Sequence, residues 1–103
     1  MTDKESLLAR EDNFKDIHFD ISKVINDTSL FMEENLIRIT FNSDNPDPIE
    51  VSVEKYTNFY RVSYWDGYAV NEFYDYQLLN KALKKFSKFS YKALDNINKF
   101  GLK

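Results

Sequence analysis

Few residues of this 103-residue chain could do chemistry, and they are scattered. His18 is the only histidine and there is no cysteine, so the sequence offers no thiol nucleophile, disulfide or zinc–thiolate site. The segment SDNPDPIE carries the oxygen ligands Asp44, Asp47 and Glu50. It lacks the central glycine and the ligand spacing of a calcium loop. We interpret this segment as a polar turn and His18 as a surface or boundary residue.

Motifs for phosphate binding or nucleophilic catalysis are also missing. Two glycines in the whole chain cannot build a glycine-rich phosphate loop. Glu33 and Glu34 are neighbouring carboxylates, but adjacent side chains diverge on a helix or a strand. The sequence therefore predicts a protein that is not an enzyme and that uses no metal and no cofactor.

Aromatic residues gather around Asp66-Gly67, and they form the first candidate binding surface. Trp65 and Tyr68 flank this dipeptide, with Arg61 on the same segment. Trp, Tyr and Arg are the residue types that dominate binding hot spots. The alternative is a cross-strand aromatic pair that only stabilises a hairpin, by ~0.2–1 kcal/mol.

Charge is strongly segregated along the chain and supplies two further surfaces. Residues 1–50 carry five basic and twelve acidic side chains, whereas residues 81–103 carry seven lysines and one aspartate. Asp12, Asp16 and Asp20 share one face of a predicted helix. By electrostatic complementarity, such an acidic face can occupy a groove of a protein partner that is built for nucleic acid. The alternative for these aspartates is a merely solvated face.

The lysines of the last segment form the third surface. These residues recur on one side of a predicted helix and are Lys81, Lys84, Lys85, Lys88 and Lys92. Such a face can contact nucleic-acid phosphates. The net charge of −3 weighs against this alternative, because a basic domain is the usual mark of nucleic-acid binding. Otherwise the lysines are the solvated side of an amphipathic helix.

The acidic face depends on the secondary structure of the N-terminal third of the chain, which carries these aspartates. Thr2 and Glu5 have the spacing of a capping box. Apolar residues at helical spacing predict a helix over residues 14–25, with Asp12 or Asn13 as its cap. These are Phe14, Ile17, Ile21, Val24 and Ile25. The competing interpretation is a strand, because Ile17, Phe19 and Ile21 alternate. Residues 30–32 are expected to be an apolar connection.

Strands must position the aromatic surface. Alternation predicts a strand within residues 35–42 and a three-stranded antiparallel meander over residues 49–73, with SDNPDP as the loop between them. Two-residue turns at Thr57-Asn58 and Asp66-Gly67 set the register. The pairs predicted from them are Glu54–Arg61, Val53–Val62, Val51–Tyr64, Arg61–Glu72, Ser63–Val70 and Trp65–Tyr68. The core face is then Val51, Val53, Tyr60, Val62, Tyr64, Ala69 and Phe73, and Glu54, Arg61 and Glu72 form a charged row on the other face.

A long amphipathic helix over residues 76–100 follows, with Asp75 as its N-cap and Gly101 at its C-terminal end. Its predicted inward residues are Leu79, Ala82, Leu83, Phe86, Ala93, Leu94, Ile97 and Phe100. We therefore expect an α+β fold in which the meander packs on this helix, preceded by one or two N-terminal helices. The chain is expected to form a single domain over residues 1–103, with residues 1–11 frayed.

The N-terminus has no apolar signal region and no run is long enough to span a membrane, so a cytoplasmic location is expected. Heavy use of Lys, Asn, Ile, Phe and Tyr, whose codons are A/T-rich, suggests a low-GC bacterium or its phage. In size, element order and composition the chain resembles small phage and mobile-element proteins that block a host enzyme by binding it, anti-CRISPR proteins included. This resemblance implies a protein-binding inhibitor. The alternatives are a nucleic-acid-binding module and a self-associating subunit, such as a homodimer.

Overall fold

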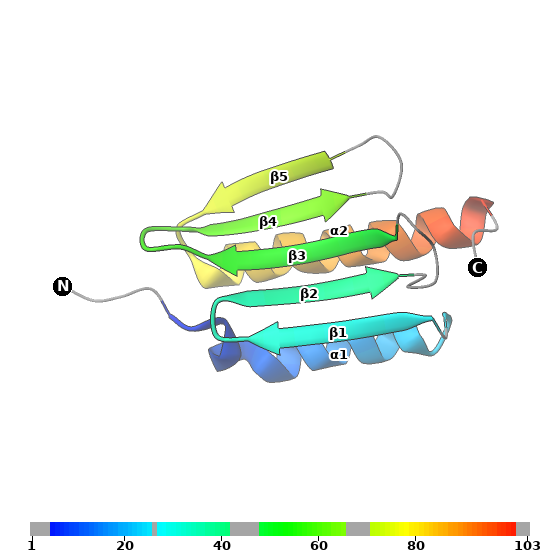
Figure 1. Ribbon diagram of the computed structural model, residues 1–103, viewed down its shortest axis with the longest axis horizontal. Coiled ribbons are helices and arrows are strands. Elements are labelled where there is room, and N and C mark those ends of the chain that lie inside the picture. The colour runs from blue at the N-terminus through cyan, green and yellow to red at the C-terminus, as the bar shows by residue number, and fades with distance from the viewer. Residues whose placement is uncertain (1–4, 26, 42–47, 66–70, 101–103) are drawn as a thin grey trace.

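Two helices pack on one face of a five-stranded antiparallel sheet, so the fold is α+β as predicted (Figure 1). The computed structural model describes residues 5–25, 27–41, 48–65 and 71–100, with side chains up to residue 95. The elements are η1 (Leu7–Arg10), α1 (Glu11–Ser22), β1 (Thr28–Glu33), β2 (Leu36–Phe41), β3 (Ile49–Lys55), β4 (Tyr60–Trp65), β5 (Asn71–Tyr76) and α2 (Leu79–Phe100).

The strands follow one another in space in their chain order, β1 to β5. The predicted three-stranded meander is therefore too small, because β1 and β2 extend the same sheet. β1 occupies the segment that was expected to be a connection. In it Leu30 and Met32 pack against the core, while Phe31 is 45% exposed on the opposite side. The three consecutive apolar residues therefore alternate between the two faces of the sheet, as in any strand.

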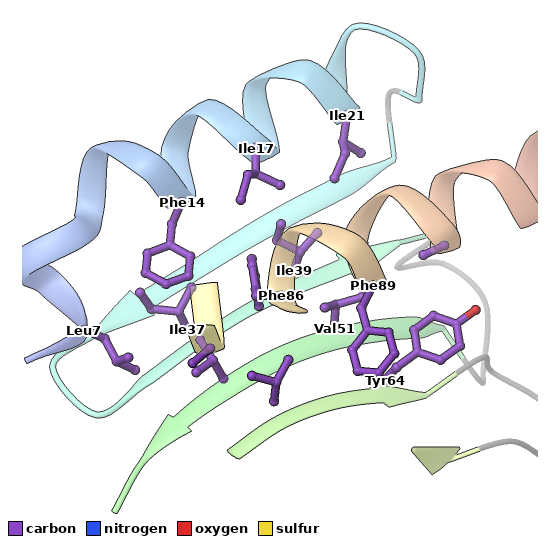
Figure 2. Packing of buried hydrophobic residues seen from close by; sticks show 14 of the residues in the cluster. Leu7, Phe14, Ile17, Ile21, Ile37, Ile39, Val51, Tyr64, Phe86 and Phe89 are labelled. Atoms are coloured by element: carbon purple, nitrogen blue, oxygen red, sulfur yellow. The ribbon is translucent and has the colours of Figure 1, made fainter. Parts of the chain in front are cut away.

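The core lies between the sheet and the two helices (Figure 2). β2 and β3 alternate as predicted, with Ile37, Ile39, Val51 and Val53 completely buried. Opposite them, the rings of Phe14 from α1 and Phe86 from α2 meet edge to face with their centroids 5.0 Å apart. These contacts fix both helices against the same side of the sheet and leave the other side to solvent among the described elements.

Residues 11–22 are helical, which decides between the two interpretations of this segment. Phe14, Ile17 and Ile21 are buried, whereas Phe19 is 61% exposed. A strand would have put Phe19 on the same side as Ile17 and Ile21. Val24 was predicted to face inward, but it is 51% exposed because α1 ends at Ser22 and the helical spacing no longer applies.

The predicted helix caps are not the observed ones. α1 begins at Glu11, so Asp12 and Asn13 lie inside its first turn. Ser6 instead caps η1, its hydroxyl accepting from the Leu8 amide at 3.2 Å. Asp75 lies within β5, and α2 begins only at Leu79. The capping box at Thr2, Gly101 and the side chains of Ile97 and Phe100 lie outside the described residues.

The inward face of α2 is broader than the sequence indicated. Leu79, Ala82, Phe86 and Ala93 are buried as predicted. Phe89 and Ser90 are buried too, and the Ser90 hydroxyl donates to the Phe86 carbonyl at 2.8 Å. This bond to the residue one turn earlier satisfies the hydroxyl without a partner outside the helix.

The register between β3 and β4 is the predicted one. Glu54 lies opposite Arg61 and Val53 opposite Val62. The turn at Thr57-Asn58 is closed by a hydrogen bond from the Tyr56 amide to the Phe59 carbonyl, 2.8 Å long.

The predicted register between β4 and β5 is wrong. Arg61 lies opposite Asp75 rather than Glu72, and Trp65 lies opposite Asn71. The connection is thus longer than two residues, and an odd shift moves every β5 side chain to the other face. Phe73 was predicted in the core and is 54% exposed. Ala69, Val70 and Tyr68 of the predicted register lie outside the described residues.

Candidate functional site

The first candidate surface is the side of the sheet that points away from the helices, and we call it the outer face. The observed registers align its side chains in three rows across the strands. The rows are Glu33, Leu36, Glu54, Arg61 and Asp75; Phe31, Arg38, Ser52, Ser63 and Phe73; and Ser29, Thr40, Glu50, Trp65 and Asn71. In the second row the rings of Phe31 and Phe73 therefore lie on the two edge strands, with an arginine and two serines between them.

Arg61 organises one edge of the outer face. Its guanidinium donates twice to Asp75, from Nε to Oδ1 at 2.8 Å and from Nη2 to Oδ2 at 3.1 Å. The same group lies 4.5 Å from the ring centroid of Phe73 and 5.5 Å from that of Phe59. The hydrogen bonds from Arg61 hold the pKa of the Asp75 carboxyl below its usual value. Arg61 is thereby fixed over an exposed ring.

The opposite edge carries a second contact of the same kind. The guanidinium of Arg38 lies 5.6 Å from the ring centroid of Phe31. Each cation covers one side of a ring and leaves the remainder in solvent. The outer face thus presents two arginine–phenylalanine pairs, on β1–β2 and on β4–β5, with Ser52 and Ser63 between them.

Carboxylates give the outer face a negative balance. Glu33, Glu50, Glu54 and Asp75 lie on it with two arginines. The described residues form no ion pair with Glu33, Glu50 or Glu54. A polyanion is therefore repelled from this surface, whereas a protein with basic side chains is attracted.

The predicted aromatic site is found only in part. Trp65 is half-buried on the outer face between Glu50 and Asn71, and Arg61 lies on the same strand. Tyr68 lies outside the described residues. The predicted charged row exists, but its third member differs from the prediction: Asp75, and not Glu72, lies opposite Arg61. Phe31 and Phe73 were missed, although a period of two over residues 28–33 would have identified Phe31.

The acidic residues of α1 lie in the helix layer, away from the outer face. Asp16 and Asp20 border a groove of about 360 Å³ between α1 and α2, while Asp12 lies outside it. Asp20 accepts a 3.0 Å hydrogen bond from the Tyr91 hydroxyl of α2, and Lys23 approaches it at 3.7 Å. Burial, followed by this contact with Asp20, raises the pKa of Tyr91. One flat partner surface cannot cover these aspartates and Trp65 together.

Four of the five predicted lysines surround one depression. Its lining comprises Tyr76, Lys81, Lys84, Lys85 and Lys88, its volume is about 280 Å³, and we call it the lysine groove. The Lys85 ammonium lies 4.3 Å from the Tyr74 ring centroid and 4.7 Å from that of Phe89. Lys92 lies outside the groove and pairs with Glu72 at 2.9 Å, which raises its pKa.

His18 is a partly buried residue at the edge of the helix layer. Its Nε2 lies 3.0 Å from Thr28 Oγ1, and burial lowers the pKa of the imidazole below its ordinary value of 6.5. No group of three or more His, Asp or Glu side chains with metal-binding geometry occurs in the described ranges.

Comparison with protein-family models, with curated proteins and with solved structures gave no match. Among the helices that the structure describes, none is long and apolar enough to cross a membrane.

Proposed function

We propose that this protein is a non-enzymatic binding module whose outer face docks on another protein. The observation that supports the proposal is the pair of arginine–phenylalanine contacts at the two edges of a sheet face that no described element covers. Strands in a sheet are ~4.8 Å apart, so Phe31 and Phe73 stand ~19 Å from each other on β1 and β5. Each exposed ring can fill an apolar pocket on the partner.

The partner's chemistry follows from the charges around these rings. Glu33, Glu50 and Glu54 lie on the outer face without ion pairs to described residues. A complementary surface carries Lys or Arg opposite these carboxylates and apolar pockets opposite Phe31 and Phe73. Small phage and mobile-element inhibitors act by covering a surface of a host enzyme, and we propose this mode of action here. The non-enzymatic part of the proposal rests on a sequence with one histidine and no cysteine.

The experiment is a matched pair of double variants. Phe31→Ser with Phe73→Ser removes both outer-face rings. Phe19→Ser with Leu78→Ser is the control. It removes two apolar side chains that lie elsewhere and are 61% and 59% exposed, somewhat more than the 45% of Phe31 and the 54% of Phe73. Tagged wild-type protein captures partners from a low-GC bacterial lysate, and the captured protein is then purified and its affinity measured. Hot-spot truncations cost ~2 kcal/mol or more each. Two of them together should therefore weaken the affinity of the outer-face variant by roughly 1000-fold.

The control variant should bind within about threefold of wild type, since scattered surface apolar groups contribute little. Circular dichroism and thermal unfolding check that both variants fold. Equal affinity of the two folded variants would refute the proposal. If light scattering shows that the outer-face variant alone turns a dimer into a monomer, the partner is a second copy of this chain.

A further inference from the structure

The lysine groove is a second surface, and its composition separates it from the rest of the helix layer. Among the described residues, its lining contains four ammonium groups and one phenol but no carboxylate. Lys81, Lys84 and Lys88 form no ion pair with described residues, and Lys85 contacts rings rather than acids. Uncompensated like charges around one depression repel each other, and an anion in it relieves that repulsion.

Carboxylates border this groove on both sides. Lys84 also faces the groove between α1 and α2, where Asp16 and Asp20 lie. Lys88 also faces the next depression along α2, where Asp95 lies with Tyr91 and Lys92. The positive stretch is therefore limited to the turns of α2 that carry Lys81 to Lys88. These lysines come from successive turns of the helix, which rise ~5.4 Å each.

Tyrosines adjoin these cations. Tyr76 lines the groove from β5, and the ring of Tyr74, 44% exposed, lies under Lys85. A cationic track beside exposed rings is the arrangement that binds single strands, because the cations follow the phosphates while the rings stack with bases.

We propose that the lysine groove binds the phosphodiester backbone of single-stranded nucleic acid. Lys81, Lys84 and Lys88 contact phosphates, Lys85 stays on Tyr74, and the tyrosines contact bases. This site is independent of the proposed function, because the outer face lies on the other side of the sheet and its carboxylates repel phosphates.

The test measures fluorescence anisotropy of a labelled twelve-residue oligothymidylate as a function of salt. Trp65 lies on the outer face and is a poor reporter of this site. For single strands the logarithm of the association constant falls by about 0.7 per neutralised phosphate for each tenfold rise in salt. Three or four contacted phosphates therefore give a slope of about −2 to −3.

The decisive variant is Lys84→Gln with Lys88→Gln. Its control is Lys15→Gln in α1 with Lys23→Gln at the C-terminal end of that helix. Both remove two positive charges from the molecule, but only the first removes them from the groove. In the groove variant the slope of log association constant against log salt should be about 1.4 less negative than in the wild type. The control should keep the wild-type slope. The double variant Phe31→Ser with Phe73→Ser should also keep it.

Four outcomes would overturn the proposal. The first is no binding at about 50 mM salt. The second is an equal loss of salt dependence in the groove variant and its lysine control, and the third is equal affinity for a duplex of the same length. The fourth is complete competition by inorganic tripolyphosphate at the concentration of the oligonucleotide. The last outcome would indicate a site for small phosphates instead. Failure of this test leaves the outer-face proposal standing, since Phe31 and Phe73 are not part of the groove.

Discussion

Phe73 is exposed beside a cation that is itself held in place. The Arg61 guanidinium bonds Asp75 with two hydrogen bonds and contacts the ring at 4.5 Å. The aromatic rings of Tyr56 and Phe59 stack beside it with centroids 4.8 Å apart. Because Arg61 is restrained before binding, a partner that stacks on this edge loses less side-chain entropy than it would with a free arginine.

His18 links the end of α1 to the start of β1 through its 3.0 Å contact with Thr28. Burial lowers the imidazole pKa below 6.5, so the unfolded chain binds more protons than the folded protein just below that pH. The stability that His18 contributes is full above pH 6.5 and is lost as pH falls through its folded pKa. We expect the melting temperature to fall over this range in the wild type and to fall less in His18→Gln.

As the only histidine in the chain, His18 gives a single imidazole titration by NMR, which reads its pKa directly. Thr28→Val is the control: it removes the hydroxyl and leaves the ring buried, so the pH dependence should persist. A pKa at or above 6.5, or parallel melting curves for wild type and His18→Gln, would contradict the expectation.

At the scale of elements, the least expected feature is the pairing of β4 with β5. Ser63 lies opposite Phe73 in the structure, whereas a two-residue turn would place it opposite Val70. Directly opposed residues have Cα atoms ~4.5–5.5 Å apart, within the range that a disulfide bridges. In this cysteine-free chain, Ser63→Cys with Phe73→Cys should therefore oxidise to an intramolecular disulfide.

The matched variant is Ser63→Cys with Val70→Cys, which fits only the two-residue turn. Loss of free thiol under mild oxidation, followed by mass spectrometry, compares the two variants. Faster crosslinking of the Val70→Cys variant would mean that the register predicted from Asp66-Gly67 is the real one.

Local sequence signals were reliable where the turn was short and misleading where it was longer. Thr57-Asn58 closes β3 on β4 in the expected register, so Arg61 and Trp65 were placed correctly on the outer face. Asp66-Gly67 was taken as a complete turn, which moved Phe73 to the wrong face. β1 was missed because Leu30 and Met32 on one side and Phe31 on the other read as a continuous apolar run.

For a similar reason, the sequence predicts the lysines of the lysine groove but not its tyrosine. Helical spacing alone gathers Lys81, Lys84, Lys85 and Lys88 on one face of α2. Tyr76 joins them only because β5 runs beside α2, which is a tertiary contact that no local pattern contains. The same applies to Asp75, which a cap pattern assigned to α2 and the sheet register assigns to Arg61.

At the scale of the whole molecule, the outer face of the sheet and α2 carry opposite charge, whereas α1 beside α2 is acidic. The outer face of the sheet has four carboxylates and two arginines, while α2 carries five lysines among its described side chains and one aspartate. Such a distribution orients the molecule during encounter, because a basic protein surface and a polyanion approach it from different sides. The net charge of −3 conceals this division.

Two opposed surfaces should respond separately to ligand. In an amide correlation spectrum, titration with the twelve-residue oligothymidylate at low salt should shift the signals of Tyr76 and of residues 81–88. The signals of Phe31 and Arg38 should stay in place, since the sheet and the core separate them from the lysine groove. Raising the salt should return the shifted signals to their free positions, because phosphate contacts are screened. Shifts centred on β1 and β2 would place the oligonucleotide on the outer face. They would contradict the proposal that the lysine groove binds it.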